Sequence, residues 1–192
     1  WGIGKMKLRI CTPYYKSISD NTRSSVQALR DAGIDLDWIP VKGTLIADSR
    51  NLAVIGLIDE VIHPELPDFT HCLMLDSDVS FTVEQFKRLC SHYLHIVSGK
   101  YKFRGSTKFR GSTKFSHLNN SSFVGGWFGD IEGQPGKWIS DEKGVVEVDF
   151  VPAGMLLIKK EVFERVAFPW FSHNFVESGL TRFQTSEDLG FC

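Results

Sequence analysis

Two aspartates separated by one residue are the part of this sequence best suited to bind a metal ion. Asp76 and Asp78 follow directly after the apolar run Cys72–Leu75. Side chains two residues apart at the end of a strand point the same way, so both carboxylates can face one ligand. Paired carboxylate oxygens with no basic residue beside them suit Mg²⁺ or Mn²⁺ carrying phosphate oxygens. The competing interpretation is a turn that begins at Asp76 and is solvated by Asp78.

The elements that would position these aspartates follow from hydrophobic periodicity. Alternating or wholly apolar runs predict strands at Lys7–Cys11, Leu36–Val41, Cys72–Leu75, Glu147–Val151 and Met155–Lys159. Apolar residues at helical spacing, with capping and stop signals, predict helices over Asp20–Ala32, Asp48–Ile62, Val83 to about Ser98, and Lys160–Val166. Ligands of open α/β sheets bind beyond the carboxyl ends of the strands, which is where Asp76 and Asp78 fall.

The alternation of strands and helices predicts an α/β fold. We expect one domain with a mostly parallel sheet and helices on both of its faces. The length of 192 residues fits a single domain with a substantial core. The chain stops at Phe191-Cys192 without a helix-stop signal, so we expect its C-terminus to be truncated.

Composition excludes several classes of protein. Hydrophobic residues make up 42% and charged residues 23%, which is typical of globular proteins, and a net charge of -1 gives no reason to expect nucleic acid as a partner. No apolar run is long enough to span a bilayer, and Trp1–Lys7 is too short and polar for a secretory signal, so we expect a cytoplasmic protein. The four cysteines lack metal-ligand spacing, which argues for reduced thiols.

A basic repeat interrupts the second half of the alternation. Lys102–Thr107 is repeated at once as Lys108–Thr113, and residues 100–115 carry six positive charges and no negative ones. Two copies of six residues are too few for a repeat fold. A solvated loop is the preferred interpretation. A flap over an anionic diphosphate and an aromatic-basic nucleic-acid contact are the alternatives, in that order.

Four motifs together resemble the GT-A glycosyltransferases, and the inverting family 2 type in particular. Asp76-Ser77-Asp78 is similar to the DxD motif of these enzymes. Thr12-Pro13-Tyr14 ends the first strand, where they bind the uracil and ribose of the donor, and Ser49-Arg50-Asn51 is similar to a segment near the nucleotide. Glu187-Asp188 resembles the acidic pair whose aspartate acts as the base. The resemblance spans about Leu8 to Cys192.

The resemblance implies a GT-A (Rossmann-like) fold and a role for each motif. Asp78 would bind Mn²⁺ or Mg²⁺ directly, and Asp76 would hold the metal's water shell or the ribose. The nucleoside or its phosphates would contact Thr12, Pro13, Tyr14, Arg50, Asn51 and Ser77. Residues 7–98 would form a nucleotide-binding half and 116–192 an acceptor and catalytic half, with the basic loop 100–115 between them.

The expected reaction moves a sugar from a nucleotide-diphosphate sugar, with UDP favoured, to an acceptor hydroxyl. Asp188 would act as the general base, with Glu187 as its alternative or as a residue that orients it. If this pair merely begins a helix, its charges favour the helix N-terminus without catalysis. The acceptor would be a glycan, lipid, protein or small molecule, and it would meet Gly154 and either Trp127 or Trp170, because aromatic rings stack on sugars.

Two other functions use the same type of fold. A sugar-phosphate nucleotidyltransferase normally carries a glycine-rich, basic signature near its first strand, which Thr12-Pro13-Tyr14-Tyr15 lacks. A non-catalytic nucleotide- or glycan-binding module needs the same pocket, so only turnover separates it from an enzyme.

Overall fold

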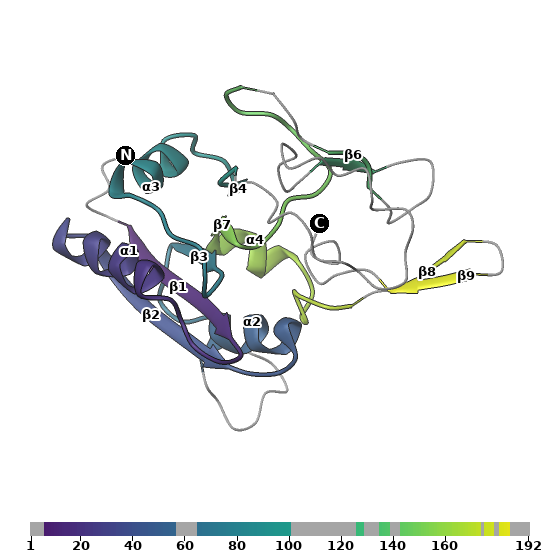
Figure 1. Cartoon of the computed structure of the whole chain (residues 1–192), viewed down its shortest axis with the longest axis horizontal. Helices are drawn as coiled ribbons and strands as arrows, with labels where there is room; N and C mark the ends of the chain where they lie inside the picture. Colours follow the sequence, from purple (N-terminus) through teal and green to yellow (C-terminus); the bar gives the residue numbers. More distant parts are fainter. Residues whose placement is uncertain are drawn as a thin grey trace.

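A five-stranded mixed sheet is the centre of the fold. The computed structural model describes residues 6–56, 65–100 and 143–173, together with the backbone of four short strands at 126–128, 135–138, 175–178 and 181–184. The sheet has the order β2-β1-β3-β7-β4 (Figure 1). Its strands are β1 (Lys7–Tyr14), β2 (Asp35–Lys42), β3 (His71–Leu75), β4 (Ile96–Ser98) and β7 (Met155–Lys159).

One strand of the sheet runs against the others. β1 is parallel to both β2 and β3, as predicted. β7 is antiparallel to β3 on one side and to β4 on the other, so β4 runs in the same direction as the first three strands, and the sheet is mostly parallel with β7 reversed. The apolar pattern could not show that β7 is reversed, because a strand buried on both faces is apolar whichever way it runs.

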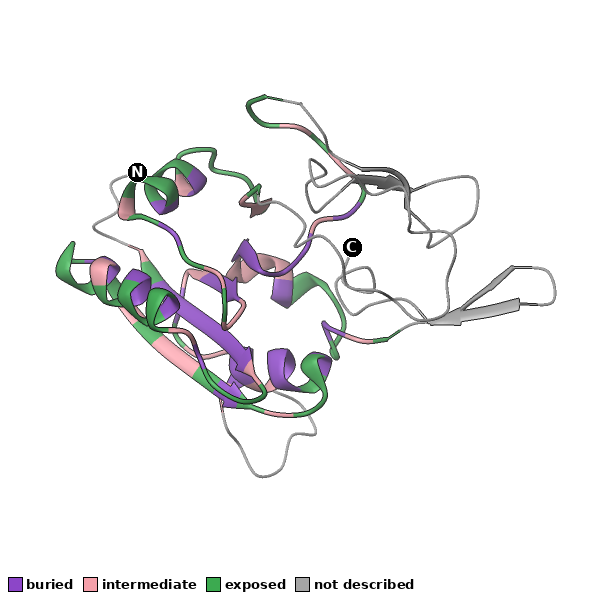
Figure 2. Cartoon of the chain, in the orientation of Figure 1, coloured by how far each residue is buried: buried purple, intermediate pink, exposed green. Residues whose placement is uncertain are grey.

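Helices cover both faces of the sheet, which confirms that part of the prediction. They are α1 (Asp20–Asp31), α2 (Ile46–Ile55), α3 (Val83–Cys90) and α4 (Lys160–Arg165). Along β3, Leu73 and Leu75 pack into the core cluster that contains residues of α1 and α3, whereas Cys72 and Met74 pack into the cluster with α2 and α4. This alternation is the period of two that a strand imposes on its side chains. Figure 2 shows β1 buried along most of its length between these layers.

The helix ends follow local signals. Ser19 caps α1 by accepting the amide of Thr22, and Thr82 and Gln85 form the predicted capping box at α3. α2 ends at Ile55 because Gly56 adopts a φ of 93°, which only glycine adopts easily. The rest of the helix predicted to extend to Ile62 lies in residues 57–64, which are outside the described part.

Three other predicted elements differ from the structure. α3 stops at Cys90 rather than near Ser98, and the end of that predicted helix is instead the strand β4. Residues 147–151 form no strand and contain only a single bridge at Phe150. β1 continues through Pro13 to Tyr14, which is tolerated because its pairing with β3 ends at Cys11.

Short antiparallel pairs complete the described secondary structure. β5 (Gly126–Phe128) pairs with β6 (Pro135–Trp138), and β8 (Phe175–Ser178) pairs with β9 (Thr181–Gln184). Within the described ranges, no helix has both the length and the apolar character needed to cross a bilayer.

The described cysteines are free thiols. Cys11 and Cys72 are fully buried on neighbouring strands, with their Sγ atoms 3.5 Å apart. Burial raises the pKa of Cys72 well above its usual value, so its thiol behaves as a small apolar group.

Candidate functional site

A turn at the carboxyl end of β3 carries the two predicted metal ligands. Asp76 follows the last residue of β3, and its amide donates to the Gly154 carbonyl at 3.0 Å. The Val79 amide donates to the Asp76 carbonyl at 3.1 Å, which closes the turn. The structure thus joins the Asp-x-Asp motif to Gly154, a residue that the sequence assigns to the acceptor side.

The start of α1 is hydrogen-bonded to this turn. The Ser19 amide donates to the Ser77 carbonyl at 2.8 Å. The Thr22 hydroxyl, which is fully buried, lies 3.1 Å from the Ser77 carbonyl and 2.8 Å from the Val79 carbonyl. Main-chain groups on both sides of Asp78 are therefore fixed to α1. Serine is a common helix cap, but nothing in the sequence indicates that the same segment supports the aspartates.

Arg50 pairs with the first aspartate of the motif. Its Nη2 lies 3.0 Å from Oδ1 of Asp76, and the Arg50 side chain is only 2% exposed whereas the Asp76 side chain is 33% exposed. The guanidinium also lies over the Phe171 ring, 5.8 Å from its centroid. The structure thus gives Arg50 a carboxylate partner inside the protein, while its predicted contact with a nucleotide stays a prediction.

The side-chain amide of Asn51 is hydrogen-bonded to the main chain of a segment that is distant in sequence. Its Nδ2 donates to the Phe171 carbonyl at 2.7 Å, and its Oδ1 accepts the Phe171 amide at 3.0 Å. Asn51 is 5% exposed, so its amide faces the core. Its predicted nucleotide contact also stays a prediction, but the observed role is to hold residues near Phe171.

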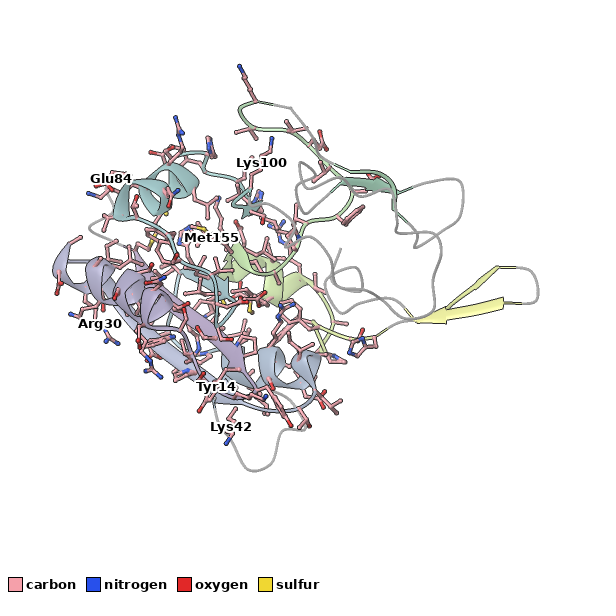
Figure 3. The ribbon with its side chains drawn as sticks, viewed as in Figure 1. Tyr14, Arg30, Lys42, Glu84, Lys100 and Met155 are labelled. Carbon is pink, nitrogen blue, oxygen red and sulfur yellow. The ribbon has the colours of Figure 1, made fainter. Side chains whose placement is uncertain are left out.

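The end of β1 presents one of its three predicted residues to the surface. Thr12 and Pro13 are buried, and the Thr12 hydroxyl accepts the indole N–H of Trp38 at 2.9 Å. Tyr14 is half-buried, and it lies at the same end of the sheet as Lys42, its register partner on β2 (Figure 3). Among the three, Tyr14 is therefore the residue best placed to meet a ligand.

Trp170 is the predicted acceptor-stacking residue whose side chain the structure describes. Trp170 is 4% exposed, with edge-to-face contacts to Phe163 and Phe168, and its indole N–H donates to the Phe163 carbonyl at 3.0 Å. This is the packing of a core residue. Trp127 belongs to β5, of which only the backbone is described, and Glu187 and Asp188 lie outside the described residues.

The two aspartates offer a cation an unequal pair of ligands. Asp78 is exposed, so its carboxylate is accessible to a hydrated ion, whereas the charge of Asp76 is partly balanced by Arg50. Hard divalent cations prefer charged oxygen ligands and complete their shell with water and phosphate. In the described part of the chain, no group of three or more His, Cys, Asp or Glu side chains converges on one point.

Comparison with known proteins defines the fold but no family. No protein-family model matches the chain, and no curated protein matches it. A solved structure described as the crystal structure of A197 from STIV is similar, with a TM-score of 0.53 and 15% sequence identity. The similarity covers 97% of this chain and 76% of that one. At this identity the likeness shows a shared α/β architecture along nearly the whole chain, and nothing about activity.

Proposed function

We propose that this protein is a metal-assisted glycosyltransferase that uses a nucleotide-diphosphate sugar, with a UDP-sugar favoured. The observation that carries the proposal is the turn with Asp76 and Asp78 at the carboxyl end of β3. Strand ends of α/β sheets are where such ligands bind. The turn is fixed to α1 and to Gly154, so its geometry is set before a ligand arrives.

Asp78 would be the direct ligand of Mn²⁺ or Mg²⁺, because it is the exposed carboxylate of the pair. Asp76, paired with Arg50, would orient the water shell of the ion or the ribose. A bound cation would act as a Lewis acid that stabilises the charge of the departing diphosphate. Tyr14, at the end of β1, would meet the nucleoside.

The acceptor side of the proposal rests on the sequence. The reaction requires a base near the acceptor hydroxyl, and Asp188 or Glu187 would supply it. Inversion at the anomeric carbon is inferred from the resemblance to family 2. The acceptor, whether a glycan, lipid, protein or small molecule, would approach Gly154, whose carbonyl already accepts the Asp76 amide.

Calorimetry with UDP and Mn²⁺ tests the metal site. Asp78→Ala should abolish the Mn²⁺-dependent part of UDP binding, and Asp78→Asn should be nearly as damaging because a neutral amide lacks the charge that a hard cation prefers. Asp68→Ala is the matched control, since Asp68 is an exposed aspartate before β3, at the opposite end of that strand. Unchanged affinity in Asp78→Ala would remove this residue from the site.

Turnover separates an enzyme from a binding module of the same fold. A positioned base contributes about 10²–10⁴-fold to rate, so Asp188→Asn should lower turnover by that factor and leave UDP binding near normal. Wild-type protein that binds UDP with Mn²⁺ but transfers no sugar and hydrolyses no UDP-sugar would favour the binding module. Full activity in Asp188→Asn would shift the role of base to Glu187.

A further inference from the structure

Asn51 and Phe171 are joined by a two-bond clamp across 120 residues of sequence. Both polar atoms of the Asn51 amide are used, one as a donor to the Phe171 carbonyl and one as an acceptor from the Phe171 amide. Because the two bonds engage both main-chain groups of one residue, they fix its position relative to α2 as well as its orientation. Asn51 and Phe171 are both buried, which makes these bonds costly to lose.

The clamped residue places its ring against Arg50. The guanidinium carbon of Arg50 lies 5.8 Å from the centroid of the Phe171 ring, and Nη2 of the same group pairs with Asp76 at 3.0 Å. Arginine has a long side chain with many rotamers, and an aromatic ring beside the guanidinium reduces the number of orientations that it can adopt. The Phe171 ring therefore helps to orient the Arg50 guanidinium toward Asp76.

These contacts form a continuous series from α2 to the turn. Arg50 and Asn51 are consecutive residues of the helix, and Phe171 contacts the first through its ring and the second through its main chain. A displacement of the Phe171 main chain would move the ring away from Arg50 and loosen the ion pair with Asp76.

We propose that Asn51 is a positioning residue that sets the ion pair between Arg50 and Asp76 by clamping Phe171. This inference rests on the proposed function, because it makes the cation affinity at Asp76 and Asp78 depend on a buried amide that touches neither ligand. Residues that hold a metal ligand in place commonly change metal affinity by about 10- to 100-fold when removed. Asn51 thus acts on the nucleotide site from within the core.

Two measurements on Asn51→Ala test the proposal. The first is the ¹⁵N-detected Nε–Hε signal of Arg50, with Arg9 as an internal reference, since Arg9 is also buried and is held by the Ala53 carbonyl and Asp37. The Arg50 signal should shift and broaden while the Arg9 signal stays unchanged. The second is calorimetry with UDP and Mn²⁺, in which the affinity should fall by about 10- to 100-fold.

Leu89→Ala is the control for a loss of stability alone. Leu89 is buried in the last turn of α3 and belongs to a core cluster that does not contain Phe171. Truncating a buried leucine costs about 2–5 kcal/mol, so this variant should melt at a lower temperature and keep both the Arg50 signal and the UDP affinity. An equal loss of affinity in Leu89→Ala would overturn a specific role for Asn51.

The remaining outcomes separate the inference from the proposed function. An unchanged Arg50 signal in Asn51→Ala would refute the positioning role. Wild-type protein that shows no Mn²⁺-dependent UDP binding would refute the proposed function, while the Arg50 signal would still test the clamp. If Asn51→Ala does not fold, Phe171→Leu keeps the main-chain bonds and removes the ring. It should disturb Arg50 in the same way, and an undisturbed signal would exclude the series of contacts.

Discussion

Replacing Thr22 by valine removes one hydroxyl from beneath the turn that carries Asp76 and Asp78. The hydroxyl lies within hydrogen-bond distance of the Ser77 and Val79 carbonyls, at 3.1 and 2.8 Å. Ser77 keeps a second donor, the Ser19 amide at 2.8 Å, so the loss falls mainly on Val79. Leaving a largely buried acceptor without its donor costs about 1–2 kcal/mol, near the lower end of the usual range because Val79 is half-buried.

Thermal denaturation and calorimetry measure the two consequences of Thr22→Val. For a domain of this size, about 1–2 kcal/mol corresponds to a fall of about 2–8 °C in melting temperature. The loosened turn should also weaken Mn²⁺-dependent UDP binding by about tenfold. Thr22→Ser keeps the hydroxyl and loses one buried methyl, worth about 0.8 kcal/mol, and should keep the affinity. If the valine and serine variants have the same UDP affinity, the hydroxyl does not hold the turn.

Two further predictions concern stability away from the turn. Arg9→Leu should lower the free energy of unfolding, measured by urea denaturation, by about 2–3 kcal/mol, because a buried charged donor to the Ala53 carbonyl is lost. Asp37→Ala should lower it by less than about 1 kcal/mol, because Asp37 is exposed. Equal losses in the two variants would contradict this prediction. Burial, with a smaller contribution from Lys159, lowers the pKa of His71 below its ordinary 6.5. Between pH 6.5 and that lower pKa, the unfolded chain therefore binds more protons than the folded chain, so the stability of the fold should fall as the pH drops through this window. Melting temperatures measured across this window should depend less on pH in His71→Gln than in the wild type.

Local patterns in the sequence predicted much of the sheet. The apolar runs located β3 and β7, and the capping box located the start of α3, because burial and capping depend on residues close together in the chain. The predicted end of α3 was wrong, and the strand β4 and the reversed direction of β7 were not predicted, for the opposite reason. They depend on which strands become neighbours, and β4 exists as a strand because it pairs with β7, about sixty residues later in the chain.

The sequence also predicted part of the candidate site. Asp76 and Asp78 lie where the rule for strand ends placed them. Sequence could not show that Thr12 and Trp170 are buried, because hydroxyl and aromatic side chains occur both in cores and at binding sites. Nor could it reveal the bonds between Asn51 and Phe171, since 120 residues separate them and asparagine has no pattern that marks a long-range partner.

The antiparallel β7 has a consequence for how the chain folds. β1, β2 and β3 lie within the first 75 residues, but β7 joins β3 only after residues 155–159 have been synthesised. Until then, one side of β3 presents the unpaired main chain of an apolar strand, and β4 has no place in the sheet, because among the described strands its pairing is with β7. Unpaired apolar strand edges promote aggregation, and pairings distant in sequence form slowly. We therefore expect the growing chain to be most prone to aggregation after β3 has been synthesised and before β7 has been reached.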